Sequence, residues 1–217
     1  MSDEVWYVYG AGGLGVETMD ILQCSIRAGA LKPHRLAFLV DAPTVDEVMG
    51  FPVVSVGRHV VGAKVTIAVG EPVYRVLMLE KVAKLGLAPA SIISLDAFVS
   101  VHAEIGVGTI IAPHCSIQAT ARIGRNVAVN TGTIIGHDVV VEDHCVLSSM
   151  VNLGGGVNVG TLGYIGMGAL IRERLRIGQT SIVGMGSVVH SDVPEEVIAL
   201  GNPARVVRKN EDKKVFK

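Results

Sequence analysis

A histidine followed by an aspartate, His137-Asp138, is the pair of residues in this chain best suited to catalysis. A neutral imidazole accepts a proton near neutral pH, and an adjacent carboxylate can orient the ring and stabilise its protonated form. The pair therefore fits a general base acting on an attacking amine or hydroxyl. The alternative interpretation is an ordinary exposed histidine, which most single histidines are.

A glycine lies 18 residues after this histidine, as Gly155 within Gly154-Gly155-Gly156. A residue without a side chain beside a base would let a thioester come close. Its N–H would be a candidate donor to the oxyanion that forms during acyl transfer. This interpretation requires a fold in which the chain returns to the same place every 18 residues.

A six-residue repeat supplies that fold. Every sixth residue from Val99 to Val189 is aliphatic, sixteen in all, and the position four residues later is mostly small. Glycine follows the aliphatic residue in eight of the sixteen hexads, where it suits a tight corner. We predict that each hexad is a short strand plus a turn and that three hexads form one coil. Residues 91–193 should form a left-handed parallel β-helix, followed by a C-terminal extension, 194–217.

Before the repeat, residues 1–90 predict a small Rossmann-like parallel α/β sheet. The expected buried strands cover 5–9, 36–40 and 65–69, and a helix is expected from Pro72 to Leu85. About 90 residues supply only one half of a dinucleotide-binding fold, so an NAD-dependent enzyme is disfavoured.

A glycine-rich turn connects the first strand to the helix that follows it. Its residues match the GxGxxG pattern: Gly10, Ala11, Gly12, Gly13, Leu14 and Gly15. The helix N-terminus beyond it can receive a phosphate, and Asp41, at the end of the next strand, is expected to bind a ribose or base. We favour a site for a nucleotide-linked sugar. A tight turn with no ligand remains the alternative.

Composition narrows the classes of function. The chain has 217 residues and a net charge of −1, which gives no basic surface field for nucleic acid or an anionic membrane. No signal-peptide pattern opens the sequence, so we expect a cytoplasmic protein. The cysteines are Cys24, Cys115 and Cys145; we interpret them as small core residues and predict no metal site.

Three other histidines can be considered as ligands of a metal ion. His102, His114 and His144 are separated by 2, 5 and 7 hexads, so they fall on three different corners of the β-helix. A zinc site of the γ-type carbonic anhydrase kind needs three converging histidines. We expect these residues to lie at the surface.

The arrangement of a glycine-rich α/β domain and uninterrupted hexads resembles the bacterial hexapeptide-repeat sugar acetyltransferases. That family includes sialic acid O-acetyltransferases and N-acetyltransferases of nucleotide-linked amino-dideoxy sugars. The segments that carry the resemblance are 10–17, 130–138 and Gly201-Asn202-Pro203-Ala204. The resemblance implies acetyl-CoA as donor, His137 as base, the acetyl carbonyl near Gly155, and a homotrimer with active sites between neighbours.

Two positions depart from the family pattern. Leu14 replaces a histidine that is common in the glycine-rich loop, and Val146 replaces a second histidine that some members have near acetyl-CoA. Both departures bear on the identity of the substrate. Neither removes the base.

We therefore predict direct acetyl transfer to a nucleotide-linked 4-amino-4,6-dideoxy sugar for a surface glycan. The closest alternative is O-acetylation of a sugar of the sialic acid type; a zinc hydratase and a non-catalytic scaffold are more remote. Arg205 and Arg208, with Lys209, are candidates for the CoA phosphates, although a solvated basic tail explains them equally well. We expect residues 213–217 to be disordered.

Overall fold

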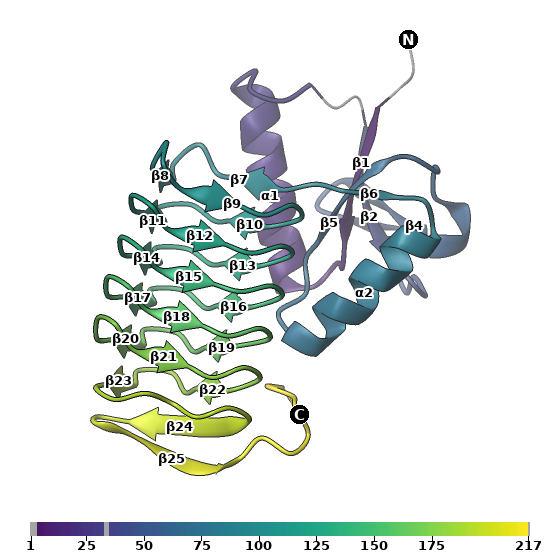
Figure 1. Cartoon of the computed structure of the whole chain (residues 1–217). Helices are drawn as coiled ribbons and strands as arrows, with labels where there is room; N and C mark the ends of the chain where they lie inside the picture. The colour runs from purple at the N-terminus through teal and green to yellow at the C-terminus, as the bar shows by residue number, and fades with distance from the viewer. Residues whose placement is uncertain (1–3, 33–34, 217) are drawn as a thin grey trace.

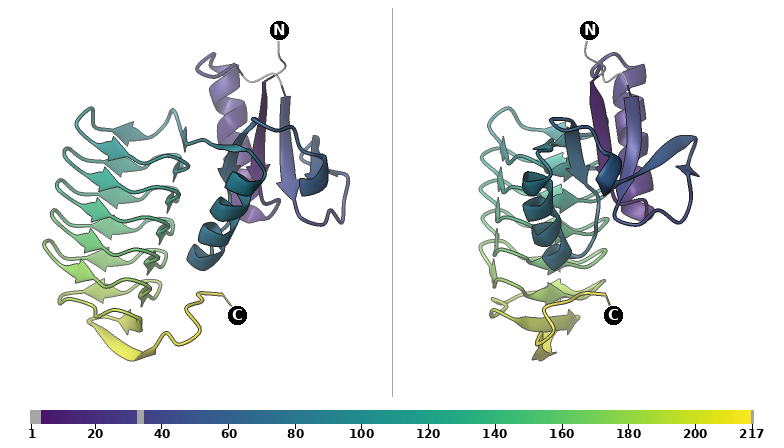
Figure 2. Two further views of the ribbon diagram at one scale, coloured as in Figure 1. Left: turned by 45° about the vertical axis from the view of Figure 1, so that its right-hand side comes forward. Right: turned by 90° about the vertical axis from the view of Figure 1, so that its right-hand side faces the viewer.

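The computed structural model describes residues 4–32 and 35–216, which form an α/β part and a β-helix side by side (Figures 1 and 2). The α/β part is a six-stranded sheet of order β3-β4-β2-β1-β5-β6, in which only β3 is antiparallel to its neighbour. Its elements are β1 (Val5–Tyr9), α1 (Gly13–Arg27), β2 (Arg35–Val40), β3 (Glu47–Val48), β4 (Phe51–Ser55), η1 (Val56–Arg58), β5 (Lys64–Ile67), α2 (Pro72–Lys84) and β6 (Ala88–Pro89). The predicted parallel sheet is confirmed, with strands β3, β4 and β6 in addition.

The two helices cover opposite faces of this sheet. Met19 and Leu22 of α1 join Trp6 and Val8 in a core that continues into the β-helix, whereas Val82 of α2 packs with the residues of the other face. Helix α1 therefore lies between the sheet and the first coils, where it contacts β7. No helix among the described residues is long and apolar enough to cross a bilayer.

Cysteine burial follows the predicted core only in part. Cys115 and Cys145 are buried inside the β-helix, as expected. Cys24 is exposed, so the prediction that it is a core residue is wrong. The reason is its place on α1, where the neighbouring Ser25 is buried instead.

The β-helix has three faces built from two-residue strands. The first face contains β7 (Ile92–Ile93), β10 (Ile110–Ile111), β13 (Ala128–Val129), β16 (Val146–Leu147), β19 (Tyr164–Ile165) and β22 (Ile182–Val183). The second contains β8 (Phe98–Val99), β11 (Ser116–Ile117), β14 (Ile134–Ile135), β17 (Asn152–Leu153), β20 (Leu170–Ile171) and β23 (Val188–Val189). The third contains β9 (Glu104–Ile105), β12 (Arg122–Ile123), β15 (Val140–Val141), β18 (Asn158–Val159) and β21 (Arg176–Ile177).

The register of these strands matches the predicted 18-residue coil. Ile117 pairs with Ile135, and Ile135 pairs with Leu153, in parallel. All three side chains are at most 1% exposed, because the coils above and below close the interior. The left-handed β-helix is confirmed, and its strands begin one hexad before Val99, at Ile93. Ile93 is 37% exposed because no coil lies above it.

The C-terminal segment is ordered further than predicted. After β23, the strands β24 (Val197–Gly201) and β25 (Ala204–Lys209) form an antiparallel hairpin, and β24 extends the first face beside β22. The chain then returns to the α/β part, where the buried Glu71 carboxylate accepts hydrogen bonds from the backbone N–H groups of Val215 and Phe216. The expected disorder is therefore wrong for residues 213–216, while Lys217 lies outside the described residues.

A buried arginine joins the two parts. Arg75 of α2 is fully buried and donates from Nε to the Asn126 carbonyl oxygen (2.7 Å) and from Nη2 to Asn126 Oδ1 (2.9 Å). Its Nη1 donates to the carbonyl oxygens of Ile67 and Val69. Burial lowers the pKa of Arg75 to about 9, which leaves the guanidinium charged at neutral pH. The joint fixes the α/β part against the corner between the third and first faces, which we call the Asn126 corner.

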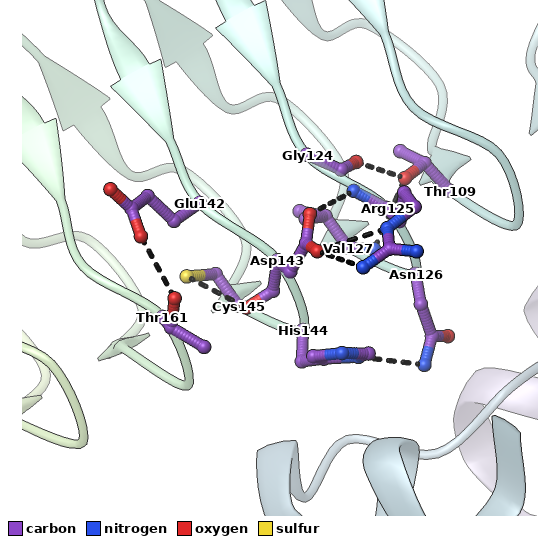
Figure 3. A network of polar contacts seen from close by, with 10 residues as sticks. All are labelled: Thr109, Gly124, Arg125, Asn126, Val127, Glu142, Asp143, His144, Cys145 and Thr161. Carbon is purple, nitrogen blue, oxygen red and sulfur yellow. Dashed lines mark hydrogen bonds and ion pairs between the residues drawn. The ribbon is translucent and has the colours of Figure 1, made fainter. Parts of the chain in front are cut away.

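His144 belongs to this joint. Its Nδ1 accepts a hydrogen bond from Asn126 Nδ2 at 3.1 Å, beside the pair formed by Arg125 and Asp143 (Figure 3). The side chain is half-buried, so the prediction of a surface residue is wrong for His144, because α2 docks on its corner. His102 and His114 are exposed, as predicted.

Candidate active site

The His137-Asp138 pair lies in the turn between β14 and β15, at the corner between the second and third faces, which we call the His137 corner. His137 Nδ1 is 2.8 Å from Asp138 Oδ2. The two side chains are 72% and 63% exposed. With Asp138 on Nδ1, the other ring nitrogen, Nε2, faces away from the carboxylate and can accept a proton.

The predicted stacking of Gly155 on this histidine is present. A Cβ added to Gly155 would lie 2.5 Å from His137 Nε2 and 2.7 Å from Cε1, so the ring occupies the space that any side chain would fill. The turn is held by the Gly156 N–H, which donates to the His137 carbonyl oxygen at 2.8 Å. Within residues 4–32 and 35–216, the Gly155 N–H donates no hydrogen bond and can serve a ligand.

Asp138 is held from two sides. Thr120 Oγ1, one coil earlier on the same corner, lies 2.6 Å from Asp138 Oδ1. The hydrogen bonds from Thr120 and then from His137 lower the pKa of Asp138 below its ordinary value. The carboxylate is therefore ionised at neutral pH, as a group that stabilises an imidazolium must be. Thr120 was not among the residues predicted from sequence, although its 18-residue distance from Asp138 was a usable signal.

The glycine-rich turn is tight on one side and open on the other. Gly10 has φ +114°, and a Cβ on Gly15 would lie 2.0 Å from the Gly10 carbonyl oxygen, so strand and helix approach too closely for side chains. A Cβ on Gly12 or Gly13 would meet no atom within 4 Å. Helix α1 starts at Gly13 with no acidic residue in its first turn, which leaves its N-terminal N–H groups available to an anion.

Leu14 and Asp41 flank this turn. Leu14 is half-buried and packs against the core that α1 shares with the sheet. Asp41 Oδ1 accepts hydrogen bonds from Tyr9 Oη (2.5 Å) and Lys81 Nζ (2.6 Å), and its side chain is 63% exposed. The bonds from Lys81 and then Tyr9 lower the pKa of Asp41. Among the described residues, no side chain donates a hydrogen bond to the second carboxylate oxygen, Oδ2.

The glycine-rich turn and His137 do not meet within one chain. The α/β part packs on the first face, through α1, and on the Asn126 corner, through Arg75. His137 is on the corner at the far side of the third face, and Figure 1 shows β14 on the side of the β-helix away from the α/β part. The structure therefore groups Gly10 to Gly15 with Asp41, and His137 with Asp138 and Gly155, at two separate places, which we call the candidate half-sites.

A pocket of about 270 Å³ lies on the second face next to the His137 corner. Its polar side chains are Asn152, Arg172 and His190, above a floor of aliphatic residues. Arg172 and His190 follow Gly136 and Gly154 at 18-residue intervals, so they continue the same edge toward the C-terminus. Sequence reasoning missed both, although reading every eighteenth residue from Gly136 would have found them.

The basic residues predicted for the CoA phosphates lie elsewhere. Arg205 and Arg208 are exposed on β25, at the end of the first face, and each donates to a carbonyl oxygen of a neighbouring residue in the chain. Lys209 ends the same strand. Among the described residues, no group of three His, Cys, Asp or Glu side chains is arranged to hold a metal ion.

Comparison with known proteins shows relatives along nearly the whole chain. No family model matches the sequence. The chain is 30% identical over 213 residues to GDP-perosamine N-acetyltransferase of Escherichia coli O157:H7, an alignment covering 94% of this chain and 96% of the relative.

Two solved structures have the same architecture. The acetyltransferase domain of PglB from Neisseria gonorrhoeae FA1090, in complex with acetyl coenzyme A, superposes with a TM-score of 0.87 at 29% identity and covers 95% of this chain and 100% of that domain. PerB from Caulobacter crescentus, in complex with CoA and GDP-perosamine, gives 0.82 at 27% identity, covering 95% and 98%. From this similarity and the fold, the chain belongs to the hexapeptide-repeat sugar N-acetyltransferases, enzymes that transfer the acetyl group of acetyl-CoA to a sugar.

Proposed function

We propose that this enzyme acetylates the amine of a nucleotide-linked 4-amino-4,6-dideoxy sugar, with His137 as the general base. The observation that carries the proposal is the exposed His137-Asp138 pair lying directly over Gly155. Support for the substrate comes from the relatives: one is a GDP-perosamine N-acetyltransferase, and another binds CoA and GDP-perosamine. The product would serve surface-glycan synthesis, and we expect the reaction in the cytoplasm.

The chemistry is direct transfer without an acyl-enzyme. The sugar amine attacks the thioester carbon, and its proton passes to His137 Nε2 while the C–N bond forms. Asp138 holds Nδ1 and stabilises the imidazolium, and the Gly155 N–H donates to the carbonyl oxygen as it becomes an oxyanion. The C–S bond then breaks, and the thiolate of CoA takes the proton from His137.

The nucleotide part of the substrate is assigned to the α/β half-site, within a unit that we delimit as residues 1–90. The open space at Gly12 and Gly13 accommodates the diphosphate at the start of α1. The free oxygen of Asp41 accepts a hydrogen bond from the ribose or base. The β-helix, residues 91–193, and the extension 194–217 would bind acetyl-CoA.

For acetyl-CoA we assign the pocket beside the His137 corner. Its aliphatic floor suits the pantetheine arm, and the cationic Arg172 suits a phosphate. Arg205 and Arg208 stay candidates for a phosphate of a CoA molecule that extends beyond this pocket. The matched substitutions Arg172→Ala and Arg205→Ala separate the two assignments, because the larger rise in KM for acetyl-CoA identifies the phosphate ligand.

A homotrimer would complete the active site. The two half-sites lie on opposite sides of one chain, so a neighbouring copy must bring its glycine-rich turn to His137. Apolar side chains that such packing would cover are exposed along the second face and its edge with the first: Phe98, Ile134, Met150, Met167, Leu170 and Met185. An exposed row of this kind is typical of an interface. Analytical ultracentrifugation should give three times the 22.8 kDa chain mass.

Release of free CoA thiol from acetyl-CoA, with GDP-perosamine as the first acceptor, tests the reaction. His137→Ala should lower kcat by 10² to 10⁴, the usual contribution of a general base. His102→Ala is the matched control, since His102 is exposed on the same corner but two coils away. Turnover only with hydroxyl acceptors would shift the assignment to O-acetylation, and failure to bind CoA would refute the acetyltransferase.

Mixing two inactive variants tests the shared site. Gly13→Asp places a carboxylate at the start of α1 and should abolish sugar-nucleotide binding, while His137→Ala removes the base. Co-refolded mixtures should regain activity, because some interfaces pair an intact turn with an intact histidine. Mixtures that stay inactive, from variants that each form normal oligomers, would show that one chain supplies both half-sites.

A further inference from the structure

Thr120 occupies a position that disfavours its side-chain type. It lies on the His137 corner, one coil before Asp138, with φ +63°. Branched side chains are uncommon in this left-handed region, where the backbone conformation costs on the order of 1 kcal/mol. Among the described residues with positive φ, only Thr120 and Thr180 are β-branched.

The hydroxyl of Thr120 makes a directed contact. Thr120 Oγ1 lies 2.6 Å from Asp138 Oδ1 and 2.5 Å from the carbonyl oxygen of Ala119, and it has one proton to donate. Because an ionised carboxylate only accepts hydrogen bonds and attracts a donor more strongly than a neutral carbonyl, the proton belongs on the bond to Asp138.

Among the described residues, only His137 and Thr120 make side-chain hydrogen bonds with the Asp138 carboxylate. Its side chain is 63% exposed, and the contacts of its two oxygens are divided between Oδ2 to His137 and Oδ1 to Thr120. Without Thr120, a solvated carboxylate on an exposed corner would sample other rotamers and leave Nδ1 of the histidine unpaired for part of the time. The position of the base would then be less well defined.

We propose that Thr120 is a positioning residue that holds Asp138 in the orientation required by His137. This inference rests on the proposed function of the His137 corner and extends it by one coil. Two contacts connect these side chains, from Thr120 to Asp138 and from Asp138 to His137 Nδ1. Nδ1 is the ring nitrogen opposite Nε2, which takes the substrate proton.

The conservative pair Thr120→Val and Thr120→Ser tests the role. Valine keeps the shape and branching but has no hydroxyl, so kcat should fall about 10-fold, the scale of one hydrogen bond to a charged group. The KM values for acetyl-CoA and the acceptor should stay unchanged, because Thr120 belongs to neither region proposed to bind them. These regions are the glycine-rich turn with Asp41 and the pocket that contains Arg172. Serine restores the donor and should restore kcat.

A double-mutant cycle with Asp138→Ala gives the decisive measurement. If Thr120 acts through Asp138, adding Thr120→Val to Asp138→Ala should lower kcat no further. Thr180→Val, at the other β-branched corner position, is the control for placing valine at positive φ and should leave kcat unchanged. An unchanged kcat in Thr120→Val, or additive losses in the double variant, would overturn the inference. A wild-type enzyme without acetyl transfer would instead refute the proposed function.

Discussion

Two corners of the same β-helix each hold a histidine beside a polar partner, yet they differ in what covers them. At the His137 corner the imidazole is 72% exposed and contacts a carboxylate. At the Asn126 corner His144 is half-buried under α2, accepts a hydrogen bond from Asn126, and has a pKa lowered by burial. Both turns come from the same six-residue repeat.

This difference shows that the repeat determines where a histidine is presented, while the docking of the α/β part determines what the histidine can do. The half-buried His144, close to the buried Arg75, takes part in the joint between the α/β part and the β-helix. An exposed histidine whose neighbour 18 residues on is a glycine has room for a reacting thioester.

The largest expected effect comes from filling the space under His137. In Gly155→Ala the new methyl would lie 2.5 Å from Nε2, so the ring must move. Displacing a catalytic group by about 1 Å costs on the order of 100-fold in rate, and we expect at least that loss in kcat. Because the methyl displaces an exposed side chain and Gly155 does not have positive φ, the melting temperature should hardly change.

Gly154→Ala is the matched control. Its methyl would lie 2.6 Å from the backbone nitrogen of Glu173, which cannot move aside as a side chain can. This variant should therefore lose stability, whereas Gly155→Ala should lose activity. An active Gly155→Ala enzyme would show that the ring works from another position than the one in this structure.

The hexad repeat made the His137 corner predictable. A fixed period specifies which residues face the interior and which share a corner. The place of Gly155 beside His137 therefore followed from the 18-residue length of one coil. The strands β1, β2 and β5 were also predictable, because each contains a run of buried, mostly apolar residues. The two-residue strand β3 and the proline-containing β4 have no such pattern. The catalytic roles themselves stay predictions.

The Asn126 corner was not predictable in the same way. Arg75 lies in a helix with no feature that points to a partner 51 residues later, and Glu71 meets backbone N–H groups 144 and 145 residues away. Periodicity reports contacts between successive coils. It carries no information on which face receives a separate domain, and for that reason His144 was assigned to the surface.

The next largest effect, on stability, should come from removing the hydrogen bonds of Arg75 that join the α/β part to the β-helix. Arg75→Met keeps an unbranched chain of similar length but removes the donor from three buried oxygen atoms and one partly buried oxygen atom. We expect the free energy of unfolding to fall by at least about 3 kcal/mol, measured by urea denaturation, because each of the three buried acceptors left unsatisfied costs about 1–3 kcal/mol. The affinity for acetyl-CoA at the other corner should be preserved.

Arg125→Met is the comparison for this variant. Arg125 pairs with Asp143 on the same corner but is 63% exposed, and exposed ion pairs contribute about 0–1 kcal/mol. Equal destabilisation by the two variants would mean that Arg75 is no more important to the joint than a surface ion pair.

The smallest expected effect is a change in the free energy of unfolding that depends on His144 and is confined to a narrow range of pH. Burial, the larger cause, lowers the pKa of His144 against the opposing effect of Asp143, and the charges of Arg75 and Arg125 add to the lowering. The unfolded chain, with an ordinary value of about 6.5, therefore binds a proton more readily than the folded protein. The free energy of unfolding should fall as the pH drops from about 7 through 6.5, and the loss should level off once the folded protein is also protonated.

His144→Gln should remove this dependence, because glutamine takes up no proton and its carbonyl can still accept from Asn126 Nδ2. The measurement is the urea midpoint at pH 7.5 and pH 5.5, with the exposed His114→Gln as control. The pKa values of Asp138 and Asp143 are lowered in the folded protein, so both groups stabilise it at pH values above their unfolded pKa of about 3.9. These contributions to the free energy of unfolding are lost only in more acid solution and do not interfere with the measurement. A pH dependence that survives in His144→Gln would assign the titration to another group and would remove the electrostatic contrast between the two corners.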